Sequence, residues 1–441
     1  MNALDALTAA GGHLHQFFTE AYVAQAKAYR APLVIRAEVG RLEDLVQYAG
    51  VVLLGLHVWL YARCERFTAR VAARFSPGGA LERYRRAFAR VWRGPGMGAA
   101  LAFVAALTAF YWLLAEPETV YFRFIRERRF GLSHYTLAHF LTDQGKGLLV
   151  DVLITSASVV ALYALMRHLP RRWGAVLGVV GGLALLASAA LDPYRARLVY
   201  SFKPLPQGAA RTAITSVLAK GHVPFQNVVV EDMSRTTEKG DAYFAGQGPT
   251  RIIVVGDTLL GRYSPKELAA IVAHEMGHLQ ESRWGARLRS ALGLLLAMLG
   301  LQALLALCAR RRWFGMNAPA DVAGFAVVLL AWWAVNTLVG PASGAFSRAR
   351  EAAANGYALA LTQDPQSFAT MMAKLTVQNR ADPVPARWLV LLEAGHPEPA
   401  RRIAHALAFA RDHGIAINLP PPLDSVPAPT PPVAAGDKDP P

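Results

Sequence analysis

Two histidines four residues apart, with a glutamate directly after the first, stand in the segment "IVAHEMGHLQ" at residues 271–280. On an α-helix, side chains four apart lie on one face, so His274 and His278 can direct ring nitrogens at one zinc ion. Glu275 is rotated by about 100° around the helix, so it would miss the metal but reach a water bound to it. This pattern is typical of a metalloprotease, in which zinc lowers the pKa of the water and glutamate takes its proton.

A motif this short also arises by chance, on a polar helix face with two solvated histidines. A catalytic zinc needs a third protein ligand and an open fourth position. Glu351, in the Ala-rich segment "SRAREAAANGYALAL", is our candidate, and Asn355 lies one turn later on the same face to support it. The alternatives are that Glu351 is a solvated carboxylate beside two arginines, or that Glu281, three residues after His278, is the third ligand.

The segment before the motif carries the signals that begin a helix. Ser264 can be the N-cap, Pro265 fits the first helical position, and Glu267 completes a capping box. We expect Gly277 to keep the helix surface bare beside the metal. An apolar face at helical spacing comprises Leu268, Ile271, Val272 and Leu279.

Strand-like segments precede this helix. The segments "NVVVED" and "TRIIVVGD" are rich in β-branched residues, and "DAYFAGQGPT" indicates a short strand followed by a Gly/Pro turn. Residues 242–255 are therefore predicted to form a β-hairpin directly upstream of the histidine helix.

The composition indicates a membrane protein, because 54% of the 441 residues are apolar. Lysine and arginine number 46 against 31 acidic residues, but the arginines cluster beside apolar runs, so we expect flanking charge on membrane helices and no nucleic-acid partner. Buried helices of a large soluble protein are the alternative. Six runs approach the length of about 20 residues that spans a bilayer: Leu45–Ala62, Met97–Ala115, Gly147–Met166, Trp173–Leu191, Leu288–Cys308 and Val322–Gly340.

Two further observations limit the class of protein. The two cysteines suggest neither a disulfide framework nor a cysteine metal site. The N-terminus lacks the basic start and long apolar core of a cleaved signal peptide.

We therefore predict a mainly α, polytopic helical membrane protein of about six spans, with a zincin-type metalloprotease domain that contains a small β-hairpin or sheet and the HExxH helix. The expected divisions are a polar N-terminal segment (1–44), four membrane helices (45–191), a first catalytic part (192–287), two membrane helices (288–340), a second catalytic part with the third ligand (341–417) and a Pro-rich disordered tail (418–441).

Several blocks make the chain resemble the type I CAAX prenyl endopeptidase family of integral-membrane zinc metalloproteases, which is related to bacterial heat-shock membrane metalloproteases. Besides HEMGH they are "YFRFIRERRFGLSHYTLAHFLTDQGKG", "DPYRARLVYSFKPLP", "DAYFAGQGPTRIIVVGDTLL", "SRAREAAAN" and "HPEPARRI". They follow the family's order and cover about residues 110–405.

The resemblance implies one Zn²⁺ held by His274, His278 and Glu351, with Glu275 as general base. Asn355 stands where the family usually has aspartate. An amide oxygen can still accept a hydrogen bond from a ligand histidine, but it lacks the charge that makes the ligand more basic.

The resemblance also implies that His396 and Arg402 lie near the zinc and stabilise the tetrahedral oxyanion. Asp241 replaces the family's usual asparagine. An edge strand would pair with an extended substrate through its main chain, and its residues are Ala242, Tyr243 and Phe244.

The expected function is a membrane-embedded zinc metalloendopeptidase that acts on protein or peptide substrates, membrane proteins included. One alternative is a catalytically impaired scaffold or holdase of the same family, which Asn355 motivates; another is a transporter with a coincidental HExxH. The family has seven membrane helices around a water-filled chamber, against six counted here. We expect a multi-pass protein of a bacterial inner membrane with its site on the cytoplasmic side, although nine arginines in residues 63–94 favour the opposite orientation.

Overall fold

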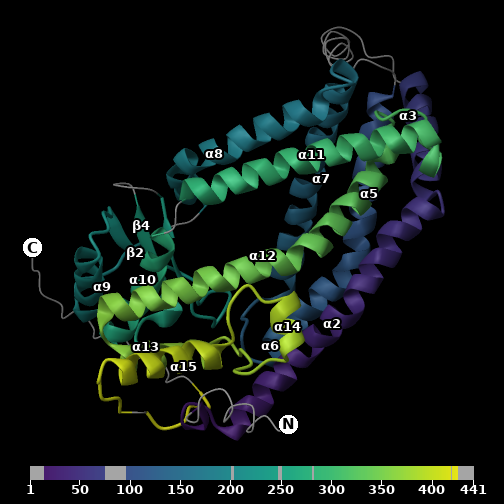
Figure 1. Cartoon of the computed structure of the whole chain (residues 1–441). Helices are drawn as coiled ribbons and strands as arrows, with labels where there is room; N and C mark the ends of the chain where they lie inside the picture. Colours follow the sequence, from purple (N-terminus) through teal and green to yellow (C-terminus); the bar gives the residue numbers. More distant parts are fainter. Residues whose placement is uncertain are drawn as a thin grey trace, which may run out of the picture.

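The structure is a computed structural model that describes residues 14–74, 96–199, 203–246, 251–280, 283–418 and 420–425. It is mainly helical, as predicted, with one small sheet at one end of the molecule (Figure 1). The long helices are α2 (Glu20–Leu53), α3 (Leu56–Arg74), α5 (Met97–Thr119), α7 (Leu137–His168), α8 (Trp173–Val199), α11 (Arg283–Arg311) and α12 (Phe325–Thr362).

Within the described ranges, four helical segments are long and apolar enough to cross a membrane: Met97–Arg129, Leu137–His168, Arg287–Arg311 and Val322–Thr362. Helices α2 and α3 pass the same test only as a pair, and they are bent by 58°. The apolar part of α8, Trp173–Ala187, is shorter.

The run Leu45–Ala62, predicted as one span, is divided between two helices. Gly55 lies at the break with a φ of +68°, a left-handed conformation that glycine adopts without strain and that ends the preceding helix. Helix α2 runs continuously from Glu20 to Leu53 and so crosses the expected division at residue 44. A 34-residue helix therefore occupies much of the segment expected to be polar and without a span.

Helices α8 and α11 lie side by side (Figure 1) because glycines on α8 let their backbones approach. A Cβ atom added at Gly174 would lie 2.6 Å from the Met298 carbonyl oxygen, and one added at Gly178 would lie 2.8 Å from Leu295 Cα. The side chains of residues 188–199 lie outside the described part.

Four strands form the sheet in the order β1-β2-β4-β3. They are β1 (Lys203–Pro204), β2 (Asn227–Glu231), β3 (Ala242–Ala245) and β4 (Ile252–Gly256). Strand β2 is parallel to β4, whereas β3 is antiparallel to β4, with Tyr243 opposite Val254. The predicted hairpin is thus confirmed for its two strands, while its turn at residues 247–250 lies outside the described residues. Strand β3 is at the edge of the sheet, as expected.

The sheet and four further helices enclose a separate apolar core, which includes Ile214, Leu218, Val272, Met276 and Phe368. The helices are α9 (Ala209–Lys220), α10 (Pro265–Leu279), α13 (Pro365–Gln378) and α15 (Pro399–Asp412). The short helix α14 (Arg387–Leu392) packs against α12 instead.

Both ends of the described chain meet at this core. The buried Phe17 accepts a hydrogen bond at its carbonyl from the Leu423 amide at 2.9 Å, and Thr19 N–H donates to the Leu423 carbonyl at 3.1 Å. Part of the segment predicted as a disordered tail is therefore placed, whereas residues 426–441 lie outside the described residues.

Candidate metal centre and substrate cleft

The HEMGH motif lies on α10, which begins as the sequence predicts. Ser264 accepts a hydrogen bond from the Glu267 amide at 3.3 Å, and the Glu267 carboxylate accepts one from the Ser264 amide at 2.7 Å. Lys374 of α13 adds an ion pair to Glu267 at 2.7 Å. The expected apolar face is buried at Leu268 and Ile271. These contacts fix the first turns of the helix and therefore the direction of its last turn, which carries the histidines.

Helix α12 packs directly against α10 and brings the third candidate ligand to the histidines. A Cβ atom added at Gly277 would lie 2.6 Å from Ala354 Cα, so glycine is required for this approach. Gly277 thus faces a neighbouring helix, and the expectation that it keeps the surface bare beside the metal was wrong. Ala354 lies one turn after Glu351 on α12. The close contact at Gly277 therefore sets the position of the Glu351 carboxylate relative to the histidines of α10.

The Glu351 carboxylate lies between the two histidine rings. Its Oε2 is 3.2 Å from His274 Nε2, and its Oε1 is 3.3 Å from His278 Nε2. Glu351 and His274 are buried. Burial lowers the pKa of His274 to about 4, although the hydrogen bond to Glu351 opposes the shift. A neutral imidazole is the form that binds metals.

These separations fit a tetrahedral zinc ion. Zinc bonds to imidazole nitrogen and carboxylate oxygen are about 2.0 to 2.2 Å long, so two ligand atoms of a tetrahedral site are about 3.3 to 3.6 Å apart. The observed distances of 3.2 and 3.3 Å between ligand atoms are close to the lower end of this range. Two histidines and one glutamate are also a ligand set that catalytic zinc sites use. Glu281, the rival ligand, lies outside the described residues.

Glu275 is half-buried beside this cluster. One candidate ligand atom from each of His274, Glu275 and His278 lies within 4.8 Å of the others, so the carboxylate is close to the position that a metal would take. Burial raises the pKa of Glu275 to about 7, and the nearby Asp241 and Glu351 charges add to the shift, while His278 opposes it.

His396 and Arg402 reach the same carboxylate from the C-terminal part of the chain. His396 Nδ1 lies 3.0 Å from Glu351 Oε2, and Arg402 Nη2 lies 3.9 Å from it. Arg402 also donates to Asn355 Oδ1 from Nη2 at 2.9 Å and from Nε at 3.3 Å. Among the described residues, Asn355 thus holds Arg402 rather than a histidine, and His274 Nδ1 is buried without a hydrogen-bond partner.

The edge strand β3 runs beside this cluster, but its three predicted substrate residues differ in position. Ala242 lies on the wall of the adjoining cavity. The Tyr243 hydroxyl donates to Glu231 at 2.9 Å, and Phe244 packs against the hydrophobic core. Of these three residues, Ala242 is therefore the one on the cavity wall, where it can meet a substrate directly.

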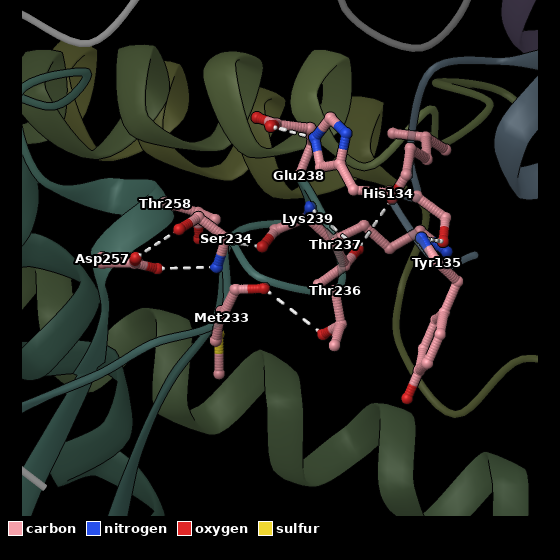
Figure 2. A network of polar contacts seen from close by, with 12 residues as sticks. His134, Tyr135, Met233, Ser234, Thr236, Thr237, Glu238, Lys239, Asp257 and Thr258 are labelled. Atoms are coloured by element: carbon pink, nitrogen blue, oxygen red, sulfur yellow. Dashed lines mark hydrogen bonds and ion pairs between the residues drawn. The ribbon is translucent and has the colours of Figure 1, made fainter. Parts of the chain in front are cut away.

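A polar network holds the loop that leads into β3 (Figure 2). Asp257 accepts hydrogen bonds from the amide and hydroxyl of Ser234, at 2.9 and 2.6 Å. Glu238 pairs with His134 at 2.8 Å and with Arg262 at 2.6 Å. The hydroxyl of Thr237 donates to the Leu132 carbonyl at 3.0 Å. This hydrogen bond joins the segment after the helix Met97–Arg129 to the protease core.

Comparison with known proteins agrees with this arrangement. The family model for peptidase family M48 matches residues 204–410, and the one described as "CAAX prenyl protease N-terminal, five membrane helices" matches residues 12–194. The chain belongs to the CAAX prenyl protease family of M48 peptidases. In the described part of the region 12–194, this M48 member has five long helices, α2, α3, α5, α7 and α8. With α11 and α12 they make seven long helices in the described ranges, of which four segments, or five with the bent α2–α3 pair, are long and apolar enough to cross a membrane.

Individual relatives match parts of this M48 chain. The "Probable CAAX prenyl protease 1" of Schizosaccharomyces pombe is 32% identical over 183 residues, 40% of this chain and 37% of that protein. The "Uncharacterized metalloprotease YhfN" of Bacillus subtilis is 26% identical over 287 residues, 63% of this chain and 66% of that protein. These alignments thus span less than two thirds of either relative. The crystal structure of S. mikatae Ste24p shares the fold, with a TM-score of 0.71 at 18% identity, over 87% of this chain and 89% of that one.

A cavity of about 1260 Å³ adjoins the candidate metal site of this M48 member. His274 and Glu275 of α10 lie on its wall, together with Ala242 of β3, Asn336 of α12 and Arg30 of α2. A substrate in the cavity would therefore reach the candidate site from between the membrane helices and the protease core.

Sequence reasoning missed one contact that ties these two parts together. Lys239 lies 2.7 Å from Glu127, a buried carboxylate near the end of the helical segment Met97–Arg129 and beyond the predicted run Met97–Ala115. Glu127 also accepts a hydrogen bond from Tyr29 of α2 at 2.5 Å and one from Arg126 at 2.8 Å. The only local signal is a pair of charged residues directly after an apolar run, which reads equally well as an ordinary membrane flank.

Proposed function

We propose that this chain is a membrane-embedded zinc-dependent endopeptidase. The observation that carries the proposal is the Glu351 carboxylate held 3.2 and 3.3 Å from two histidine Nε2 atoms, with Glu275 beside them on the wall of a cavity. His274, His278 and Glu351 would hold one Zn²⁺, and the family membership supports a metal of this kind.

A zinc ion held by these residues would supply a Lewis acid for the peptide carbonyl and would lower the pKa of an attacking water. Glu275 takes the proton of that water and passes it to the leaving amine. Arg402 donates hydrogen bonds toward the oxyanion that develops on the carbonyl oxygen. Its guanidinium is held in place by Asn355 and is largely shielded from solvent. His396, which is exposed, supplies a second donor.

The substrate would be a protein or peptide in an extended conformation. The open edge of β3 offers main-chain hydrogen-bonding groups along the cavity wall, and such pairing recognises backbone rather than sequence. The cavity between membrane helices and protease core admits substrates that are themselves membrane proteins.

Metal analysis combined with an activity assay tests this function. The purified, detergent-solubilised protein should hold about one zinc per chain and cleave casein or a membrane-protein substrate. Glu275→Gln should keep the zinc and lose cleavage, because the amide cannot accept the proton. Glu351→Ala should lose both. Equal cleavage by wild type and Glu275→Gln would reject the mechanism, and full zinc retention by Glu351→Ala would reject the third ligand.

We further propose a bacterial inner membrane, with the site facing the cytoplasm. Arg348 and Arg350 flank the ligand on α12, and positive charge near a membrane helix favours the cytoplasmic side. Both native cysteines, Cys64 and Cys308, are buried, so a cysteine introduced at the exposed Lys266 gives a clean probe. In intact cells this cysteine should resist a membrane-impermeant maleimide and react after lysis. Labelling before lysis would place the site on the outer face.

A further inference from the structure

The edge strand β3 is preceded by an acidic residue that faces the cavity. Asp241 is exposed, and the space it is exposed to is the cavity whose wall also contains His274 and Glu275. Burial by the surrounding protein raises the pKa of its carboxyl group, and Glu231 adds to the shift. The charge is therefore inside the proposed substrate cleft.

Backbone hydrogen bonding places the Asp241 carboxylate at the open side of the strand. The Asp241 carbonyl accepts a hydrogen bond from the Gly256 amide at 3.0 Å, so the backbone of this residue points toward β4. In an antiparallel ladder the next residue points the other way. The outward amide of Ala242 donates to Asp241 Oδ1 at 2.9 Å. The carboxylate thus lies where a substrate strand would begin to pair.

The surrounding contacts hold this carboxylate in a fixed position. Thr258 donates from its hydroxyl to the Lys239 carbonyl at 2.9 Å (Figure 2). Asn379 accepts from the Gly240 amide at 3.0 Å and donates to the Gly240 carbonyl at 3.3 Å. Because the two residues before Asp241 are bound on both sides, the carboxylate is preorganised, and preorganised charges discriminate between ligands more strongly than mobile ones.

The charge of Asp241 is not balanced as that of Glu351 is. Glu351 is surrounded by His274, His278, His396 and Arg402. Among the described residues, Asp241 forms no ion pair, and the nearby cation that acts on its charge is His396, which is already paired with Glu351. The nearest charged residue along the chain, Lys239, pairs with Glu127 instead. The cleft therefore carries an acidic group that is available to a ligand.

We propose that Asp241 is a specificity-determining residue that selects substrates with a lysine or arginine side chain at the position beside Ala242. This inference rests on the proposed function. A cation there gains the attraction of a fixed carboxylate in a confined cavity, whereas an acidic side chain is repelled by Asp241 and by Glu275. The competing explanation is that Asp241 acts only as the acceptor that fixes the Ala242 amide.

Asp241→Asn separates the two explanations, because asparagine keeps the oxygen that accepts from Ala242 and removes the charge. Internally quenched peptides that differ only by lysine, glutamine or glutamate at each of three positions on either side of the cleaved bond are assayed with the zinc-loaded full chain. The readout is the ratio of kcat/KM between the lysine and glutamine peptides. Asp232, exposed on the same segment and outside the cavity wall, provides the charge-matched control Asp232→Asn.

At one position, the wild type and Asp232→Asn should prefer lysine by about tenfold, which corresponds to about 1.4 kcal/mol. In Asp241→Asn the ratio should fall below about twofold, mainly through KM, and Asp241→Glu should restore part of it. An unchanged ratio in Asp241→Asn, or no lysine preference in the wild type, would overturn the inference while the proposed function stands. Failure of the wild type to cleave any peptide would overturn both.

Discussion

Replacing Gly277 with alanine tests whether the contact between α10 and α12 sets the ligand geometry. The added Cβ would lie 2.6 Å from Ala354 Cα, 2.9 Å from its Cβ and 3.0 Å from its carbonyl oxygen. Carbon atoms in contact are about 3.5 Å apart, so the two helices must separate by nearly ~1 Å at this point. The atoms in the way belong largely to the backbone of Ala354, which cannot rotate aside as a side chain would.

This separation would act on the metal site more than on the fold. Gly277 precedes His278, and Ala354 follows Glu351 by one turn, so the shift changes the His278–Glu351 distance of 3.3 Å. Metal–ligand distances are held to about 0.2 Å, so we expect zinc affinity to fall by about 10- to 100-fold. Overpacking costs about 1–3 kcal/mol of stability, and the better helix propensity of alanine offsets about 1 kcal/mol of it.

Zinc affinity is measured by titrating metal-free, detergent-solubilised protein in competition with a chelator, and folding is followed by thermal unfolding. Gly356→Ala is the matched control on α12, because the nearest atom to its added Cβ is His405 Cε1 at 3.8 Å, an ordinary contact. Equal zinc affinity in Gly277→Ala, Gly356→Ala and the wild type would show that the contact between α10 and α12 does not set the ligand geometry.

Three further changes test the supporting contacts. Asn355→Asp should maintain or raise zinc affinity and cleavage, because the carboxylate would form an ion pair with Arg402, now 2.9 Å from the amide oxygen; a sharp loss of activity would show that the amide itself is needed. Ser264→Ala should lower stability by about 1 kcal/mol through loss of the capping box, with zinc affinity unchanged, as thermal unfolding and titration would show. Glu127→Gln and Lys239→Met should each lower the unfolding temperature, with a coupling of about 1 kcal/mol in a double-mutant cycle, and additive effects would argue against their ion pair.

The features predicted correctly from the sequence are those with local signals. The start of α10 follows from Ser264, Pro265 and Glu267, which lie within four residues of one another and cap the same helix. The β3–β4 hairpin follows from β-branched segments separated by a Gly/Pro turn. The approach of Glu351 to the histidines has no local signal; it was expected from a carboxylate on an Ala-rich helical segment and from the ordered blocks of the resemblance.

The errors concern contacts between segments far apart in the sequence. A glycine on a helix looks the same whether it faces a metal, lipid or another helix, so the packing of Gly277 against Ala354 was invisible. The break at Gly55 was hidden inside a continuous apolar run, because hydropathy does not report a change in helix direction. The partner of Asn355 was likewise misjudged, since Arg402 comes from a helix 47 residues away.

The chain departs from the usual family pattern at Asn355 and at Asp241, and together these two changes move one negative charge within the site. Relative to the usual family pattern, a negative charge is removed behind the ligands and one is added at the substrate edge. With only an amide to accept its hydrogen bonds, Arg402 keeps its full positive charge 3.9 Å from Glu351 and close to the proposed oxyanion. Asp241 places its charge on the cavity wall that also includes Glu275. The formal charge of the site is then unchanged, but a negative charge that the family places behind the ligands is found here at the substrate edge, where it favours a cationic substrate residue near Asp241.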